Sequence, residues 1–135
     1  MNTETPIAAI ASALAPQAIG IVRTSGEGVI ELASRYFSRP EALRAAKSHT
    51  LVHGWFLDSG PGGKREPIDE VLAAVFRGPG SFTGEDMVEI YCHGGVNVLT
   101  SVLRVLAAGG FRQAEQGEFT LRAFLNGKTD LTRAE

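Results

Sequence analysis

Two charged side chains lie at strand positions whose neighbours on the same face are apolar or aromatic. Successive side chains of a strand point to opposite faces, so Arg23 shares a face with Ile21. By the same alternation Glu89 shares a face with Met87 and Tyr91. Because an unpaired desolvated charge costs several kcal/mol, each needs a partner. Two interpretations follow: the two residues pair with each other or face solvent, or they line a ligand pocket.

In a pocket, each of the two groups has a characteristic chemistry. The carboxylate of Glu89 can accept two N–H groups from a flat amino-heterocycle. The guanidinium of Arg23 can donate two parallel hydrogen bonds to carboxylate or carbonyl oxygens. The pair therefore suits a planar, nitrogen-rich ligand that also carries oxygens.

Nucleophilic and metal chemistry have weaker support. Cys92 precedes His93, but neighbours on a strand point to opposite faces and do not form an acid–base couple. We interpret Cys92 as a small core residue. The other histidines, His49 and His53, are scattered, and the acidic residues from Glu85 onward are a loop end plus one strand position. The spacing therefore predicts neither a catalytic residue nor a metal site.

Two segments resemble nucleotide-binding patterns superficially. The glycine-rich residues 78–84 lack the Gly-Lys-Ser/Thr of a P-loop, so the lysine that would reach the phosphates is missing. Residues 126–130 read Asn-Gly-Lys-Thr-Asp, which approaches a guanine-reading Asn-Lys-x-Asp, but the inserted Gly127 breaks the spacing. We therefore expect no nucleotide-hydrolysing site in this chain.

Composition limits the classes of protein. The 135 residues allow one domain, and an apolar fraction of 44% with 21% charged residues is typical of a packed core. A net charge of −2 provides no basic field for bulk nucleic acid, and the single cysteine excludes an internal disulfide. No apolar stretch approaches about 18 residues and the first residues lack a basic signal-peptide region, so we expect a soluble, cytoplasmic protein with no membrane contact.

Short apolar segments bounded by turn formers predict six strands. Three glycines and a proline surround Phe82 in a loop over residues 78–86, between two of these strands. The 16 glycines, about 12% of the chain against a usual level of about 7%, are thus partly explained by turns. The strands are expected over residues 6–11, 19–24, 50–57, 68–76, 87–92 and 111–114.

Three helices are predicted between these strands. Ser25 stands where an N-cap belongs for a helix over residues 27–37, and Pro40 follows as a stop signal. Apolar residues at helical spacing predict a second helix over 96–108 and a third over about 118–125. At the end of the chain, residues 132–135 have the Thr-x-x-Glu spacing of a capping box, which begins a helix.

Three sequence runs together resemble a known family. The first is Gly-Ile-Val-Arg-Thr-Ser-Gly at residues 20–26. The second is Ser-Phe-Thr-Gly-Glu-Asp at 81–86, followed by Glu89 and His-Gly-Gly at 93–95. The third is Gly-Glu-Phe-Thr-Leu-Arg-Ala-Phe-Leu-Asn-Gly-Lys at 117–128. In this order and spacing they resemble the N-terminal domain of the tRNA-modification GTPase family MnmE, also called TrmE.

The resemblance implies an α+β fold, a mixed sheet with packed helices similar to the folate-binding domain of aminomethyltransferases. It implies that residues 1–128 form a folate-binding and dimerisation domain. In the family a helical domain follows, into which a Ras-like GTPase is inserted. Residues 129–135 are then expected to start that helical domain, which is otherwise absent here, and the capping box would be its first turn.

The resemblance also implies a function for the parent protein. The domain would bind 5-formyl- or 5,10-methylene-tetrahydrofolate as a one-carbon donor. The parent GTPase, a homodimer working with a flavin-containing subunit (GidA or MnmG), would install a carboxymethylaminomethyl group on carbon 5 of the tRNA wobble uridine. GTP, magnesium and potassium would bind only in the absent GTPase domain, so this chain alone would catalyse nothing.

Family positions for folate contact match Arg23, Glu89 and Lys128. We expect Glu89 to bind the N–H donors of the pterin ring, and Arg23 and Lys128 to hold oxygens elsewhere on the folate. For Lys128 a simple solvated lysine is the alternative. For the whole domain the alternative is a pure dimerisation module without folate binding. The chain departs from the family pattern in the turn at residues 14–18 and at Gln116.

Overall fold

The structure, a computed structural model, describes residues 3–11, 19–59 and 65–128. The turn at residues 14–18 and the capping box of residues 132–135 lie outside these ranges. The six strands in the described ranges are β1 (Ile7–Ile10), β2 (Gly20–Ser25), β3 (Thr50–Ser59), β4 (Arg65–Phe76), β5 (Met87–Cys92) and β6 (Arg112–Gln113). The four helices there are α1 (Val29–Ser34), α2 (Pro40–Ala45), α3 (Val96–Ala108) and α4 (Glu118–Leu125).

The strands form one sheet in the order β3-β4-β5-β2-β1-β6. Neighbours are antiparallel except β1 and β6, which pair in parallel after the chain crosses over through α3. The sheet is therefore mixed, and with four helices the predicted α+β class is confirmed. All six predicted strands are present, and they begin or end within a few residues of the expected positions.

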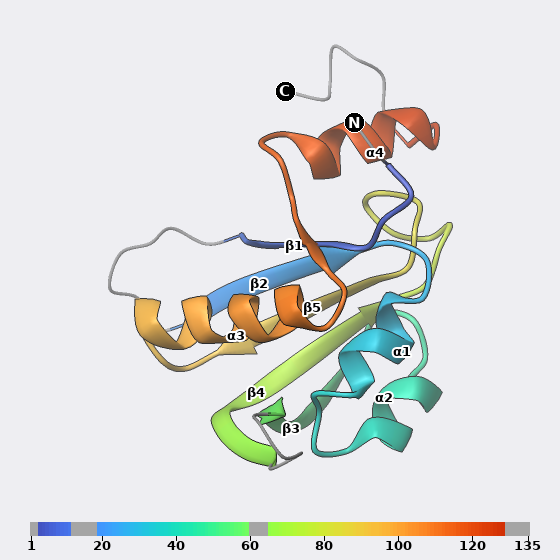
Figure 1. Ribbon diagram of the computed structural model, residues 1–135. Coiled ribbons are helices and arrows are strands. Elements are labelled where there is room, and N and C mark those ends of the chain that lie inside the picture. Colours follow the sequence, from blue (N-terminus) through green and yellow to red (C-terminus); the bar gives the residue numbers. More distant parts are fainter. Residues whose placement is uncertain (1–2, 12–18, 60–64, 129–135) are drawn as a thin grey trace.

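One face of the sheet carries the hydrophobic core. Val22, Ile90 and Ala73 lie side by side across β2, β5 and β4, and all three are buried. Helices α1 and α3 cover this face, and α3 buries Leu99 and Val102 against it (Figure 1). Full burial of each such aliphatic side chain stabilises the fold by about 1.5–3 kcal/mol. Helix α4 lies apart from the other helices, beside the segment that leads into β1.

The first helix is shorter than the predicted 27–37, since it ends at Ser34, and its N-cap also differs from the prediction. It begins at Val29, with Gly28 at the N-cap in the left-handed region (φ 80°), whereas Ser25 belongs to β2 and is fully buried. The hydroxyl of Ser25 bonds to the loop after β4 and does not cap the helix. Pro40 does not act as a stop signal: it is the first residue of α2, a helix beyond the three predicted, where its missing N–H costs nothing.

The opposite face of the sheet is partly apolar and open. Its side chains alternate with the core residues, so Leu51, Trp55 and Leu72 share the face of Arg23 and Glu89. The three apolar side chains are 58%, 44% and 38% exposed. Among the described helices none has the length and apolar character that a membrane crossing requires.

A close approach in the core gives a test of this packing. A Cβ atom on Gly54 of β3 would lie 2.8 and 2.9 Å from two ring carbons of the buried Phe37. We expect Gly54→Ala to lower the free energy of unfolding by about 1–3 kcal/mol, because the buried ring of Phe37 would have to shift to make room for the methyl group. Urea denaturation followed by Trp55 fluorescence measures the change.

Phe37→Leu supplies the control. In the Gly54→Ala background, Phe37→Leu should lower the free energy of unfolding by less than it does in the wild type, because the smaller side chain leaves room for the new methyl group. Two effects that simply add would contradict the proposed clash.

Candidate functional site

Arg23 and Glu89, the two charges singled out from the strand pattern, are cross-strand partners on β2 and β5. Nε of Arg23 donates a hydrogen bond to Oε2 of Glu89 at 2.6 Å. The two side chains are 35% and 13% exposed. The pair also lines a cavity of about 220 Å³. The two interpretations drawn from the sequence are thus compatible, because the charges pair with each other at the wall of a cavity.

Tyr91 holds the second oxygen of Glu89. Its hydroxyl donates a hydrogen bond to Oε1 at 2.6 Å. Burial, and then the hydrogen bond to the Glu89 carboxylate, raise the pKa of Tyr91 to about 12, so the hydroxyl keeps its proton at neutral pH. Alternation had placed Tyr91 on this face but assigned it no role. With one donor on each oxygen, the carboxylate is held in one orientation.

The remaining walls of the cavity are apolar. Phe76 ends β4, Met87 begins β5, and Phe82 comes from the loop between them. The guanidinium of Arg23 also lies 5.9 Å from the ring centre of Phe119 on α4, a cation–π distance. Sites that enclose drug-sized ligands measure about 300–1,000 Å³. This smaller cavity therefore suits one flat ring system of a larger ligand.

Lys128 lies apart from this cavity. Its ammonium donates a hydrogen bond to the carbonyl of Pro79 at 3.0 Å, and it is not a lining residue. Pro79 belongs to the same loop as Phe82. The structure thus brings two of the three predicted site residues together and connects the third to the loop that forms a wall.

That loop, residues 78–86, is closed by its own hydrogen bonds. The amide of Gly78 donates to the carboxylate of Asp86 at 2.8 Å, and the hydroxyl of Ser81 donates to the carbonyl of Glu85. Gly84 has φ 82°, and a Cβ there would lie 2.9 Å from Cβ of Asn126. Glycine is therefore required at this position by both backbone conformation and space.

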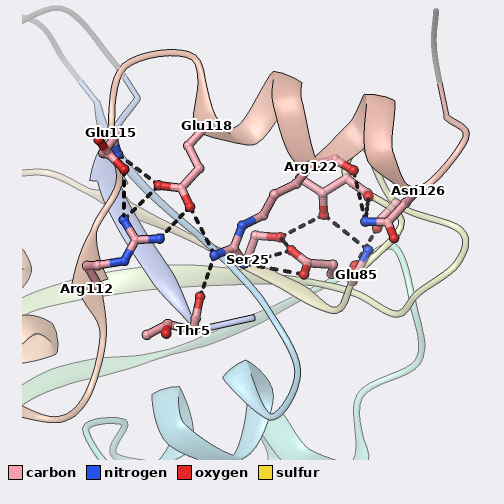
Figure 2. A network of polar contacts seen from close by, with 10 residues as sticks. Thr5, Ser25, Glu85, Arg112, Glu115, Glu118, Arg122 and Asn126 are labelled. Atoms are coloured by element: carbon pink, nitrogen blue, oxygen red, sulfur yellow. Dashed lines mark hydrogen bonds and ion pairs between the residues drawn. The ribbon is translucent and has the colours of Figure 1, made fainter. Parts of the chain in front are cut away.

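Sequence reasoning missed a buried ionic network beside the loop (Figure 2). Glu118 and Arg122, one turn apart on α4, are 0% and 1% exposed. Glu118 accepts hydrogen bonds from both Nη atoms of Arg112 and, at 3.1 Å, from Nη2 of Arg122. Burial alone would raise the pKa of Glu118, but hydrogen bonds from Arg112, the Glu115 amide and Arg122 outweigh it and hold the pKa at about 2. The i, i+4 spacing was the available signal, although it does not reveal burial.

A larger cavity of about 390 Å³ is lined in part by Glu85 and Arg122 of this network. It contains none of the three predicted site residues. Within the described ranges, no group of three or more histidine, cysteine or acidic side chains is arranged to hold a metal ion. The residues that line this larger cavity are Thr3, Glu4, Glu27, Glu85, Arg122, Leu125 and Asn126.

Cys92 is a core residue, as predicted. It is 1% exposed, and burial followed by the charge of Asp69 raises the pKa of its thiol to about 12. A thiol of this kind is not a nucleophile at neutral pH. The neighbouring His93 points to Glu70, whose carbonyl lies 2.6 Å from its Nδ1.

The geometry defines an α+β domain with a small cavity that is lined by one ion pair and by aromatic side chains. The family model described as GTP-binding protein TrmE N-terminus matches residues 6–128, so the chain belongs to this family. The resemblance seen in the sequence motifs is confirmed.

Relatives of similar sequence carry the name tRNA modification GTPase MnmE. The one from Treponema denticola is 60% identical over 130 residues, which are 96% of this chain and 27% of that protein. The one from Treponema pallidum is 54% identical over 129 residues, 96% of this chain and 25% of that protein. The one from Symbiobacterium thermophilum is 50% identical over 137 residues, 100% of this chain and 29% of that protein. The chain thus spans about a quarter of the length of these relatives.

The low pKa of Glu118 predicts a pH dependence of stability. Its folded pKa of about 2 lies below the ordinary value of 4.5, so its contribution is present above about pH 4.5 and is lost as the pH falls toward 2. Glu118→Gln should lower stability at pH 7 and flatten its decline between pH 5 and pH 2.5, measured by urea unfolding at several pH values.

Glu66→Gln, a substitution of an exposed residue on β4, is the matched control and should keep the wild-type profile. If the Glu118→Gln variant loses stability with acid as steeply as the wild type, another group is responsible.

Proposed function

We propose that residues 1–128 form a reduced-folate-binding domain whose ligand is 5-formyl- or 5,10-methylene-tetrahydrofolate. The observation that carries the proposal is the Arg23–Glu89 pair at the wall of an apolar and aromatic cavity. A pterin is a flat ring with an amino-pyrimidine edge, so it can stack on an aromatic side chain while its edge donates to a carboxylate. The resemblance of the sequence motifs implies the same ligand class, since the family positions for folate contact match Arg23 and Glu89.

Hydrogen-bond capacity supports the role of Glu89. An ionised carboxylate offers about four lone-pair sites, and Arg23 and Tyr91 use one on each oxygen. Each oxygen can therefore accept one further N–H, which matches two donors on the edge of a pterin. Within the described part of the chain, Arg23 donates only through Nε, which leaves its Nη groups for ligand oxygens.

Lys128 is proposed to contact the part of the ligand that extends beyond the cavity. Its ammonium is exposed and bonded to the carbonyl of Pro79. A ligand carboxylate would be a stronger acceptor than this neutral carbonyl, because it adds the attraction between opposite charges to the hydrogen bond.

For the parent protein we propose a cytoplasmic tRNA-modification GTPase. The folate would supply the one-carbon unit, and a flavin-containing subunit (GidA or MnmG) would act with it to place a carboxymethylaminomethyl group on carbon 5 of the wobble uridine. GTP, magnesium and potassium would bind in a GTPase domain outside this chain. Residues 129–135 would begin the helical domain that carries it. The relatives named tRNA modification GTPase MnmE support the tRNA-modification GTPase in this proposal.

We also propose that the domain forms a homodimer through the open face of the sheet. Leu51, Trp55 and Leu72 expose a large part of their apolar surface on this face. Covering such a surface with a second copy removes it from water. The same observation favours the alternative function, a pure dimerisation module without folate binding, so ligand binding and association must be measured separately.

Calorimetric titration with 5-formyltetrahydrofolate tests the site. Wild type should bind, and Glu89→Gln should bind about 10- to 100-fold more weakly, because hydrogen bonds to a charged group contribute about 1.5–3 kcal/mol. Glu70→Gln is the matched control: Glu70 is a carboxylate on β4 that pairs with His53 and does not line the cavity, so its variant should bind normally. No heat from the wild type at high micromolar ligand would exclude folate binding. Normal binding by the Glu89→Gln variant would exclude this site.

Light scattering tests the association. Leu51→Glu places a charge on the open face and should shift the protein toward monomers, because each charge would have to be desolvated in the dimer. Thr100→Glu adds the same charge to an exposed position on α3 and should leave association unchanged. A wild type that dimerises fully but ignores folate would support the module alternative. A wild-type monomer would exclude the dimer.

A further inference from the structure

Helix α4 and two residues that follow it, Asn126 and Lys128, hold the loop of residues 78–86 at three points. Each contact joins a side chain from the α4 region to an acceptor of the loop, and each acceptor lies on a different part of the loop. The contacts are Arg122 Nη1 to the carboxylate of Glu85 at 3.2 and 3.3 Å, Asn126 Nδ2 to the carbonyl of Thr83 at 2.9 Å, and Lys128 Nζ to the carbonyl of Pro79 at 3.0 Å.

The Arg122 contact differs from the other two because the guanidinium is buried and fixed from two sides (Figure 2). Its Nη2 donates to the carboxylate of Glu118 at 3.1 Å and to the carbonyl of Thr5 at 2.6 Å. Glu85 therefore meets a cation whose position is already set. The carboxylate of Glu85 also accepts a hydrogen bond from Ser25 of β2 at 2.7 Å, which connects the loop to the sheet.

The anchored end of the loop determines where Phe82 lies. The Gly84 amide donates to the carbonyl of Ser81 at 3.3 Å, and the Ser81 hydroxyl donates to the carbonyl of Glu85, so residues 81–85 form one closed unit. Phe82 projects from this unit, lines the cavity and is still 55% exposed. With half of its surface in water, Phe82 has little packing of its own to hold it. Its position depends on the unit that carries it.

We propose that Arg122 is a positioning residue for the cavity. Through Glu85 it holds the loop so that Phe82 forms one wall beside the Arg23–Glu89 pair, although Arg122 itself does not line that cavity. A preformed wall spares the ligand the entropic cost of ordering a loop on binding. The effect of Arg122 on ligand affinity rests on the proposed folate site. Its effect on the position of the loop does not depend on that proposal.

Arg122→Lys keeps the charge and removes the fork that reaches Glu85 and Glu118 together. Arg112→Lys is the matched control, since Arg112 bonds the same carboxylate of Glu118 from the β6 side. Asn126→Ala is a second variant that releases the Thr83 contact and leaves no buried charge unpaired.

The first readout is hydrogen exchange of the Gly84 and Gly80 amides, whose acceptors are the carbonyls of Ser81 and Arg77. It needs no ligand.

We expect amide exchange in the loop to rise about ten-fold in Arg122→Lys and to rise less in Asn126→Ala, with a change of about two-fold or less in Arg112→Lys. The second readout is the affinity for 5-formyltetrahydrofolate, which should fall at least about five-fold in Arg122→Lys. In a Phe82→Ala background the same substitution should change affinity little, because the wall through which it acts is gone.

Unchanged loop exchange in the Arg122→Lys variant would overturn the inference, whatever the Asn126→Ala variant shows. So would equal effects of Arg122→Lys and Arg112→Lys, which would indicate general destabilisation. If the losses of affinity in Arg122→Lys and Phe82→Ala simply add in the double variant, Arg122 does not act on affinity through Phe82. A wild type that binds no folate would defeat the proposed function, and the exchange data alone would then decide whether Arg122 holds the loop.

Discussion

The buried carboxylate of Glu118 is the constraint on which the cavity side of the molecule depends. A charge with no solvent exposure costs several kcal/mol unless it is paired, and here Arg112 and Arg122 pair it from two sides. Helix α4 buries three side chains, and two of them are charged. The helix is therefore held mainly by polar contacts, which join it to β6, to the segment before β1 and to the loop after β4.

The two faces of the sheet differ: one carries the hydrophobic core and the other carries the candidate site. Its core face is closed by α1 and α3 with aliphatic side chains, whereas its open face carries the Arg23–Glu89 pair and exposed apolar residues. The cavity forms where this open face meets the loop that bears Phe82. A rigid sheet thus supplies the charged wall, and a loop held by α4 supplies the aromatic one.

Most elements of the fold could be predicted because their signals are local. Helix α3 shows a wide apolar face at helical spacing, and each strand is a short apolar segment between turn formers. The errors arose where one residue type serves two roles. Pro40 can end a helix or begin one, and it begins α2. Ser25 can cap a helix or satisfy a buried loop, and its hydroxyl bonds Glu85.

For the candidate site, the sequence alone determined which residues share a face, because alternation along a strand is a property of the backbone. It thereby identified Arg23 and Glu89 as charges among apolar neighbours, and the motifs identified the family. Only the tertiary structure decided that the two side chains meet, since they are 66 residues apart and depend on the register of β2 against β5. The burial of Arg122 against Glu85 was decided in the same way. Pairing and burial depend on contacts between distant segments, and local sequence patterns do not specify them.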